Sequence, residues 1–483
     1  MESLKEKTAK GLFWGAMNNG VQQFIGLLFG IILGRLLTPE DYGMMAMISI
    51  FSLIATALQN SGFSTAIANL SHPKDEDYNS VFWFNIIVGS LMYVILFFCA
   101  PLIGLFYHND AVVPLCRYAF LSILLSSFGT VQNAWLFKNL KAKQQAKAAI
   151  LSVILSSLTG AIMAFNGYAY WSLATQGNIY VLSVTLMAWH YSHWRPSVHH
   201  ITFAPVRRMF KFSCKILIST ITSQINNNIL NILLGRHFST HDTGNYNQAY
   251  QWDSKCFNLV QGMVNQVAQP VFVDLRSDGD RQLNAMRKMM RFTSLISFPL
   301  LFGFGLVAKE FIVVTLTAKW LGSAQLIQIL CFSGAFMPLC TLQSNMIISK
   351  GKSGTYFWCT FALGIAEISL MLTIWPWGIK TMVIGYVLLN ILWLFVWHFF
   401  CQRLTGYRIS MLLKDILPFA LSAMGTMVVT YLITSPIHNL WILLVSRIIL
   451  AVAIYYGVMK IAHVRILLEC EHFILSKIKK DKQ

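Results

Sequence analysis

Long apolar stretches separated by short polar breaks fill this 483-residue chain from Gly11 to near Ala462. Each stretch is long enough to cross the hydrocarbon core of a bilayer, which takes about 20 residues of α-helix. We therefore predict an all-α integral membrane protein with about 14 transmembrane helices. The predicted spans are residues 11–37, 43–58, 80–107, 112–136, 146–165, 171–191, 212–238, 246–271, 289–314, 323–348, 356–375, 380–400, 416–433 and 440–462.

Composition supports this prediction. Hydrophobic residues make up 56% of the chain and charged residues 12%, against roughly 25% charged residues in a soluble domain. The spans leave no room for a separate soluble domain. The first span follows residues 1–10 without a cleavage-like site, so we expect it to be retained. The nine cysteines show no CxxC spacing, which favours packing roles over disulfides or metal ligands.

Basic residues crowd alternate breaks between the predicted spans. Because basic loops stay in the cytoplasm, this asymmetry predicts a multi-pass protein of the cytoplasmic (inner) membrane with both termini cytoplasmic. The net charge of +18 then reflects topology and contact with anionic lipid headgroups, and does not imply a nucleic-acid partner. The sparse set of breaks holds Arg35, Arg236, Lys309, Lys319 and Lys380.

Two turns of the chain repeat one another at a shift of 201 residues, from Arg35 to Arg236. An Asp and a Gly follow each arginine at the same offsets, and Gln23 matches Gln224. The first and seventh helices then run the same way, which predicts two six-helix lobes. The predicted divisions are an N-terminal lobe (1–192), a cytosolic amphipathic linker (193–211), a C-terminal lobe (212–402), two further helices (403–462) and a cytosolic basic tail (463–483).

Polar side chains recur at steps of three or four along two predicted spans, so they share one face of each helix. Such side chains are costly in lipid unless they meet a partner or water, so the stripes indicate a cavity. The alternative is interhelical hydrogen bonding in a tight bundle. The predicted cavity residues are Gln22 in the first helix, Gln224, Asn227 and Asn231 in the seventh, and Gln251, Asn258 and Gln261 in the eighth.

Ionisable residues at membrane depth are few and mostly cationic. A cationic, water-filled cavity would attract an anionic group such as a diphosphate. Each residue has the alternative of a local ion pair or of a side chain that reaches the boundary. Asp253 and Glu367 are candidates for coupling transport to Na⁺ or H⁺, and no metal, cofactor or catalytic residue is predicted. The candidate cations are Lys255, which lies on the polar stripe, and Arg447, Arg117, Lys215 and Arg35.

The motifs that carry a family resemblance run over essentially the whole chain. The motifs are Arg35-Leu36-Leu37-Thr38-Pro39-Glu40-Asp41-Tyr42-Gly43, Asn60-Ser61-Gly62-Phe63-Ser64-Thr65-Ala66-Ile67, Gly244-Asn245-Tyr246 with Ala249, Gln269-Pro270-Val271, and Ala318-Lys319-Trp320-Leu321-Gly322-Ser323-Ala324. In their order and spacing they resemble the multidrug/oligosaccharidyl-lipid/polysaccharide (MOP) flippase superfamily, and within it the polysaccharide transporters of the colanic-acid exporter type.

The resemblance implies two lobes around a central cavity that carry an undecaprenyl-diphosphate-linked oligosaccharide to the outer leaflet by alternating access. In the similar lipid II flippases, the last two helices form a groove for the lipid tail. Membrane lipids, the substrate, and a polymerase or glycosyltransferases of the same pathway are the implied partners. Many relatives carry an acidic residue in the seventh helix where this chain has Asn226, Asn227, Asn228 and Asn231, so an ion site there is not carried over.

Three other functions fit parts of the pattern. A membrane glycosyltransferase or polymerase would need a large external loop or an acidic metal-binding pair, which the short breaks do not offer. A multidrug or small-molecule exporter of the same superfamily would favour an acidic cavity. A structural scaffold would not need polar stripes or a lobe repeat. We therefore expect a transporter and not an enzyme.

Overall fold

The computed structural model describes residues 4–60, 73–198 and 202–469, together with Ile67, Leu70 and Glu471. Among these, the side chains of residues 4–19, 59–60, 208–216 and 219 are not described. The described residues form α-helices and three short 3₁₀-helices, and they contain no strand. The helices are α1 (Leu4–Leu36), α2 (Pro39–Asn60), α4 (Asp75–Tyr107), α5 (Val112–Ala119), α6 (Leu121–Ser127), α7 (Thr130–Lys138), α8 (Ala142–Phe165), α9 (Tyr170–Tyr191), α10 (Ala204–His237), α11 (Thr240–Asp274), η1 (Leu275–Ser277), α12 (Gly279–Leu316), η2 (Ala318–Trp320), α13 (Leu321–Ser349), α14 (Ser353–Ile374), η3 (Trp375–Trp377), α15 (Ile379–Thr405), α16 (Ile409–Thr434) and α17 (Leu440–Ile461).

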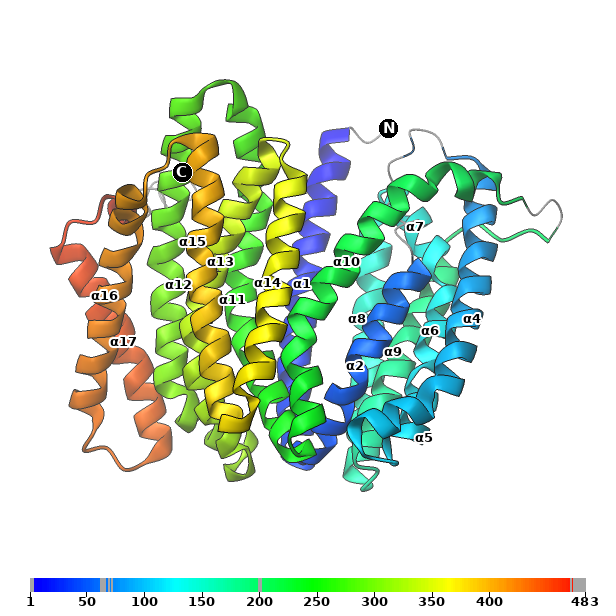
Figure 1. The fold of residues 1–483 in the computed structure, drawn as a ribbon, viewed down its shortest axis with the longest axis horizontal. Coiled ribbons are helices and arrows are strands. Elements are labelled where there is room, and N and C mark those ends of the chain that lie inside the picture. Colours follow the sequence, from blue (N-terminus) through cyan, green and yellow to red (C-terminus); the bar gives the residue numbers. More distant parts are fainter. Residues whose placement is uncertain are drawn as a thin grey trace. The chain divides into compact units, whose positions relative to one another are not determined.

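The protein is an all-helical, multi-span membrane protein (Figure 1). Within the described residues, nine helices are long and apolar enough to cross a bilayer, or ten if the bent pair Val112–Ser127 and Thr130–Lys138 counts as one span. Helix α11 is 35 residues long but lies outside this set, because amide and charged side chains interrupt its apolar sequence. This is the helix in which the sequence predicts a polar stripe.

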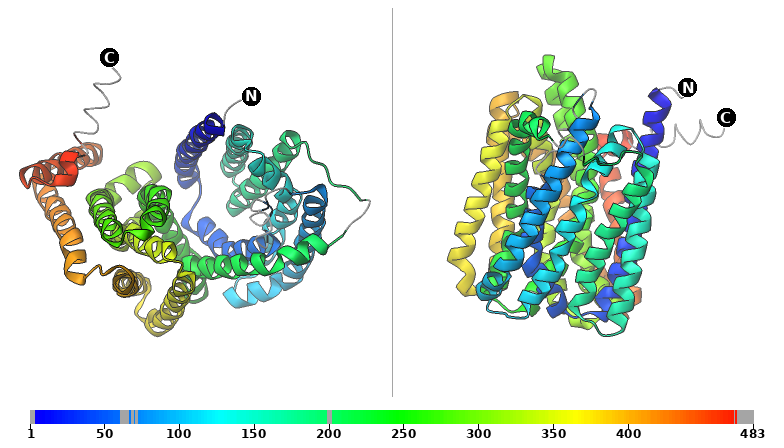
Figure 2. Two further views of the ribbon diagram at one scale, coloured as in Figure 1. Left: turned by 90° about the horizontal axis from the view of Figure 1, so that it is seen from above. Right: turned by 90° about the vertical axis from the view of Figure 1, so that its right-hand side faces the viewer.

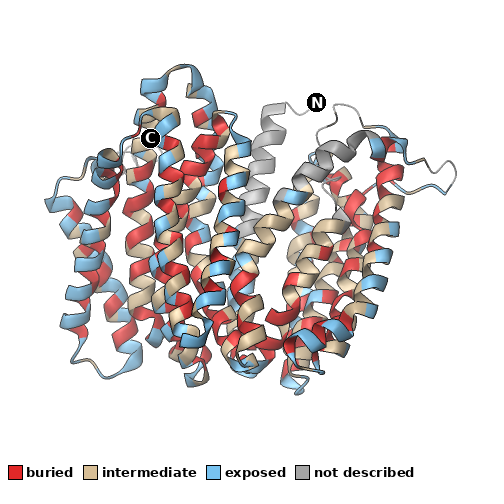
Figure 3. Cartoon of the chain, viewed as in Figure 1, coloured by how far each residue is buried: buried red, intermediate tan, exposed pale blue. Residues whose placement is uncertain are grey.

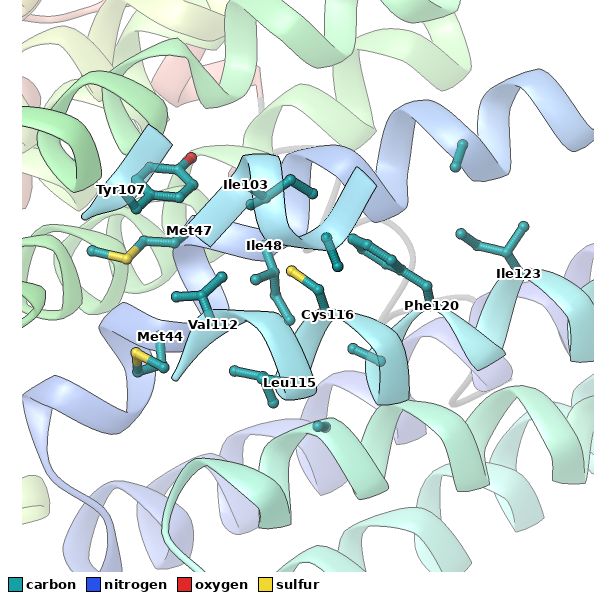
Figure 4. Packing of buried hydrophobic residues seen from close by; sticks show 14 residues of the cluster. Met44, Met47, Ile48, Ile103, Tyr107, Val112, Leu115, Cys116, Phe120 and Ile123 are labelled. Atoms are coloured by element: carbon teal, nitrogen blue, oxygen red, sulfur yellow. The ribbon is translucent and has the colours of Figure 1, made fainter. Parts of the chain in front are cut away.

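The chain forms two compact units, residues 1–244 and 245–483. In the first unit, α10 packs against α2 and α4, and α1 packs against α8. Helix α10 begins at Ala204, inside the segment predicted as a linker. A buried core holds α2, α4, α5 and α6 together, and Figure 4 shows Ile48 and Phe120 among its side chains.

The predicted fourth span, residues 112–136, is broken into α5, α6 and α7, with a bend of 42° before α7. The breaks free backbone carbonyls that would otherwise lie unpaired inside the bundle. Helix α9 supplies the missing donors: Asn178 Nδ2 bonds to the carbonyl of Tyr118 at 2.9 Å, Thr185 Oγ1 to that of Leu125 at 3.2 Å, and Trp189 Nε1 to that of Phe128 at 2.7 Å. The broken span is therefore stabilised by one face of its neighbour.

The two repeated turns begin their following helices in the same way. At the start of α2, the Asp41 carboxylate accepts hydrogen bonds from the backbone N–H and the hydroxyl of Thr38, at 2.9 and 3.1 Å. At the start of α11, the Ser239 hydroxyl donates to Asp242 at 2.8 Å and accepts from its N–H at 3.1 Å. Both pairs satisfy N–H groups that a helix start leaves unpaired.

In the second unit, α12 packs against α13, α16 and α17, and the end-on view of Figure 2 shows α16 and α17 beside it. Two of the family motifs meet at the start of α13. The Asn245 carboxamide oxygen accepts from the N–H and the hydroxyl of Ser323, at 3.0 and 2.9 Å. A Cβ on Gly322 would lie 2.9 Å from the Asn245 side chain, so only glycine fits there.

Helices α16 and α17 expose apolar side chains along their outer faces, which Figure 3 shows as pale blue segments. Leu432, Val452 and Ile461 are among them. Large apolar side chains exposed over the length of a helix are typical of a surface that meets lipid. These two helices therefore carry part of the lipid-facing surface of the second unit.

Candidate transport site

One face of α11 is polar and exposed. Gln251, Asn258 and Asn265 follow one another at steps of seven residues and are all exposed. Seven residues are close to two turns of helix, so the three amides form one stripe. Exposed amides at membrane depth require water or a polar partner, because lipid offers no hydrogen bonds. This face of α11 is therefore the candidate for a hydrated path.

Part of the same stripe also bonds to α13. Gln261 Nε2 donates to Thr341 Oγ1 at 2.7 Å, and Asn345 Nδ2 donates to Asn265 Oδ1 at 3.0 Å. Gln251 instead bonds to Asn247 on its own helix at 2.6 Å. The stripe thus combines interhelical hydrogen bonds with exposed amides.

The amides of α10 belong to the first unit. Asn227 is exposed and Gln224 is half-buried, whereas Asn231 is buried, at 3% exposure. Within the described residues, the Asn231 carboxamide oxygen has no hydrogen-bond partner. Gln22 on α1 is half-buried. The predicted stripe residues on α10 therefore differ in exposure, and Asn231 points inward.

Lys255 lies on α11 between the exposed amides and is half-buried. Its ammonium nitrogen lies 4.2 Å from the centre of the Trp252 indole ring, which is a cation–π contact. Among the described residues, no carboxylate forms an ion pair with it. The Trp252 ring therefore stabilises the positive charge of Lys255.

Arg447 on α17 is buried in a fixed network. Its guanidinium forms an ion pair with Glu310 of α12 at 2.8 Å, and it donates to the Thr434 hydroxyl of α16 and to the Leu306 carbonyl, both at 3.2 Å. Arg447 also lines a largely apolar cavity of about 580 Å³ between α12 and α17. The network ties three helices together and neutralises the arginine.

The remaining candidate cations lie in the first unit. Arg117 on α5 donates to the Phe97 carbonyl at 3.4 Å and stacks over the Phe97 ring at 4.5 Å. Arg35 is exposed at the end of α1. The side chain of Lys215 lies outside the described residues, as do those of Asn18 and Asn19. Arg117 and Arg35 thus belong to the first unit, whereas Lys255 and Arg447 belong to the second.

The two candidate coupling acids are buried in the second unit. Asp253 and Glu367 are each 2% exposed. A Cβ on Gly334 of α13 would lie 2.7 Å from Asp253 Oδ1, and Asn390 Nδ2 of α15 donates to Glu367 Oε1 at 3.1 Å. Within the described residues, Asp253 Oδ1 and Glu367 Oε2 have no hydrogen-bond partner.

Three tyrosines connect these acids in space. Tyr246, Tyr250 and Tyr386 each lie near both acids. Helices α11, α14 and α15 thus gather two carboxylates and three phenols in one buried cluster. Each carboxylate retains one oxygen that can bind a proton or a cation.

Sequence reasoning missed a second buried ionic group. Asp415 of α16 is fully buried and accepts hydrogen bonds from Arg287 at 2.9 and 3.1 Å, from Arg291 at 2.5 Å and from the Tyr407 hydroxyl at 3.0 Å. From the sequence, Arg287 and Arg291 are expected to be basic residues of a cytosolic break between two spans. Their four-residue spacing on one helix face was the available signal.

A helical bundle with lipid-facing apolar helices, a polar helix face and buried paired charges defines a membrane transporter. Residues 32–325 match the family described as "Polysaccharide biosynthesis protein". This is more than half of the chain, which therefore belongs to that family, in the MOP superfamily. The resemblance expected from the motifs is confirmed, and the chain is a transporter and not an enzyme.

Curated relatives point the same way. The chain is 22% identical over 427 residues to the teichuronic acid biosynthesis protein TuaB of Bacillus subtilis (strain 168), covering 88% of each chain. It is 22% identical to the lipopolysaccharide biosynthesis protein WzxC of Escherichia coli (strain K12), covering 72% of this chain and 71% of that protein. Both are named for the synthesis of surface polysaccharides.

Solved structures show the same fold. The lipid II flippase MurJ in an inward closed conformation superposes with a TM-score of 0.77, at 15% identity, over 95% of this chain and all of that one. An inward-facing multidrug resistance MATE transporter of the MOP superfamily gives a TM-score of 0.65, at 16% identity, over 80% of this chain and 95% of that one. The fold is therefore that of MurJ and MATE transporters.

Proposed function

We propose that this protein moves an undecaprenyl-diphosphate-linked oligosaccharide from the inner to the outer leaflet of a bacterial cytoplasmic membrane, by alternating access. Such a unit would be destined for O-antigen, capsule or exopolysaccharide. The family membership and the relatives named for polysaccharide synthesis support this substrate class. The fold shared with a lipid II flippase supports the mechanism.

The physical task explains the polar face of α11. A diphosphate bearing sugars cannot cross hydrocarbon without losing its hydration, which costs far more than thermal energy. Exposed amides at Gln251, Asn258 and Asn265 supply hydrogen bonds along the path. The prenyl tail needs no such path and can stay in an apolar environment, for which the cavity between α12 and α17 is suited.

Lys255 is the residue proposed to bind the anionic diphosphate. Of the described candidate cations in the second unit, Arg447 is neutralised by Glu310, whereas Lys255 has only the Trp252 ring beside it. A half-buried ammonium group on a polar helix face attracts a diphosphate. The diphosphate dissociates when water enters and hydrates both charges. Lys255 is therefore the proposed contact for the diphosphate.

Asp253 and Glu367 are the proposed coupling site. Both carboxylates are buried and each keeps one oxygen without a partner in the described residues. A buried carboxylate avoids the cost of its charge by binding a proton or a cation such as Na⁺. Loading and unloading of this site would tie substrate movement to an ion gradient, since the family uses no catalytic chemistry.

We also propose a topology of about 14 spans. Two six-helix lobes are followed by α16 and α17, and both termini lie in the cytoplasm. Glycosyltransferases that build the substrate and a polymerase that consumes it would then act on opposite sides of the membrane. The alternation of basic and sparse breaks supports this orientation.

Reconstitution tests the function directly. Purified protein in liposomes is supplied with a lipid-diphosphate-linked oligosaccharide in both leaflets, and arrival in the outer leaflet is followed with a membrane-impermeant lectin or glycosidase. Lys255→Ala should slow transfer about tenfold or more, the loss expected for a charge-assisted hydrogen bond. Lys255→Arg should be milder, and the exposed Lys380→Ala should match the wild type.

Two results would change the conclusion. Equal transfer by the wild type and Lys255→Ala would remove the diphosphate contact while keeping the flippase. No transfer of any such lipid, together with export of small organic molecules, would make the chain a small-molecule exporter, the activity named for the MATE neighbour.

A further inference from the structure

A polar cavity lies at the end of the first unit that carries Lys74 and Arg195, the end that the basic-loop rule assigns to the cytoplasm. Residues 192–198, here called the strap, cross the first turns of α4 and enclose a volume of about 550 Å³. Cavities of this size hold ligands from a sugar to a small drug. No residue of the proposed transport path lines it.

The strap is held firmly in place. Its Ser197 N–H donates to Asn79 Oδ1 at 2.9 Å, and Trp83 Nε1 donates to the Ser197 carbonyl at 2.9 Å. Trp194, 7% exposed, packs against the rings of Tyr78 and Phe82, with centroids 5.9 and 5.7 Å away. The cavity is therefore formed before any ligand arrives, which lowers the entropic cost of binding.

The lining combines acceptors, donors and an aromatic surface. The Trp135 indole stands edge-on to the His193 ring, with centroids 5.8 Å apart. Asp75, Glu76 and Arg195 are exposed residues. Arg195 Nη1 already donates to the carbonyls of Ser192 and Trp194 in the strap, at 2.6 and 2.8 Å, so the other guanidinium nitrogens are the ones available to a ligand. The lining residues used here are Asp75, Glu76, Asn79, Trp135, His193 and Arg195.

Asn79 is the lining residue whose position is most firmly fixed. It is 8% exposed, and its carboxamide oxygen is already committed to the strap. Among the described residues, no acceptor pairs with its amide nitrogen, and Asn79 is one of the residues that line the cavity. A buried amide N–H₂ that is oriented by its own oxygen offers two fixed donors to a ligand.

We propose that the strap cavity binds a saccharide ring that carries no negative charge. Asp75 and Glu76 can accept hydrogen bonds from neighbouring hydroxyls, whereas Asn79, His193 and Arg195 donate. The Trp135 face can pack on the apolar C–H side of a pyranose. A sugar ring has matching features, because its hydroxyls lie around the edge and its C–H groups form an apolar face.

Other ligand classes fit less well. Two exposed carboxylates outnumber the single guanidinium, which disfavours a phosphate or a nucleotide sugar. Within the described part of the chain, no three His, Cys, Asp or Glu side chains are grouped to hold a metal ion. The site goes beyond the proposed transport path and does not depend on it, because a sugar would bind whether or not the chain moves a lipid.

Saturation-transfer difference NMR on the full-length protein tests this site. The protein is held in an amine-oxide detergent, because maltoside detergents would compete. The probes are the methyl glycosides of glucose, galactose, mannose, N-acetylglucosamine and rhamnose, with glucuronate as the anionic comparison. At least one neutral glycoside should bind, and more tightly than glucuronate.

Glu76→Gln and Arg195→Ala should each weaken that binding about tenfold or more, while Asp110→Asn, an exposed acid elsewhere in the unit, should not. Size-exclusion chromatography checks that each variant is folded. No binding of any neutral glycoside, or equal affinity in all variants, would overturn the site. Binding without lipid transfer would contradict the proposed function alone, and transfer without binding would contradict this site alone.

Discussion

The backbone carbonyl of Pro39 fills the place where Gly244 would carry a side chain, since a Cβ there would lie 1.7 Å from the Pro39 oxygen. Gly43 faces the carbonyl of Thr240 in the same way, at 1.9 Å. Pro39 and Thr240 are equivalent positions of the internal repeat, and so are Gly43 and Gly244. The two repeated turns therefore pack reciprocally, each glycine against the other turn's backbone.

This contact predicts that Gly244→Ala is strongly destabilising. The obstacle is backbone, which cannot move aside as a flexible side chain does, so the cost should be at least about 1–3 kcal/mol, as for overpacking of a core. Gly26→Ala is the matched control, because nothing lies within 4 Å of its Cβ position, and alanine is the better helix former. Thermal unfolding in detergent should show a lower midpoint for the first variant alone; equal midpoints would contradict the reciprocal packing.

The repeat could be predicted from the sequence because a Gly, an Arg, an Asp and a second Gly recur at one shift. Its packing could not, because nothing in Pro39 or Gly244 taken alone shows that two turns about 200 residues apart meet. The long apolar helices could also be predicted, because each prediction depends only on the residues of its own segment. The break in the span from Val112 was not predictable, since the donors that make it tolerable lie on α9.

Those donors predict a specific effect of Trp189→Phe. The indole N–H bonds to the Phe128 carbonyl at 2.7 Å, and phenylalanine keeps most of the packing while leaving that carbonyl unpaired. The expected loss is about 0.5–1.5 kcal/mol, the net worth of one hydrogen bond, because this bond lies at an exposed site. Trp358→Phe, at 64% exposure, serves as the control for replacing an indole. A denaturation midpoint for Trp189→Phe no lower than that of the control would mean that water satisfies the carbonyl instead.

The candidate site was predictable to the level of helix faces. Amides spaced along α11 indicated a polar stripe, and the structure exposes Gln251 and Asn258 on it. Which ionisable groups are neutralised was not predictable, because Glu310 lies 137 positions before its partner Arg447. Ion pairing depends on which helices touch, and the sequence alone did not provide that information.

The Asp415 cluster predicts a dependence of stability on pH. Burial, and then the charge of Asp415, raise the pKa of Tyr407, which lies between α15 and α16, above its ordinary value of 10. The folded protein therefore keeps a proton that the unfolded chain releases above about pH 10, so this contribution is complete below pH 10 and is lost as the pH rises.

Tyr407→Phe should remove that contribution. Its stability should be lower at neutral pH by about 1 kcal/mol, the worth of one hydrogen bond, and should fall less steeply than that of the wild type between about pH 10 and 11. The exposed Tyr168→Phe should follow the wild type. Unfolding midpoints measured at pH 8, 10 and 11 check this, and parallel curves for all three proteins would contradict it.

The Arg447–Glu310 ion pair allows structural and transport roles to be separated. Glu310→Leu alone leaves a buried guanidinium unpaired, and Arg447→Met alone leaves a buried carboxylate unpaired, so each should cost about 3–5 kcal/mol. The double variant removes both charges and should recover most of that loss, because an apolar pair of similar volume fits the same place. Thermal unfolding of the four proteins gives the coupling energy, and lipid transfer measured on the folded double variant then decides the role of Arg447. Transfer restored together with stability would make the arginine a structural group, whereas a stable double variant without transfer would place its guanidinium in contact with the substrate.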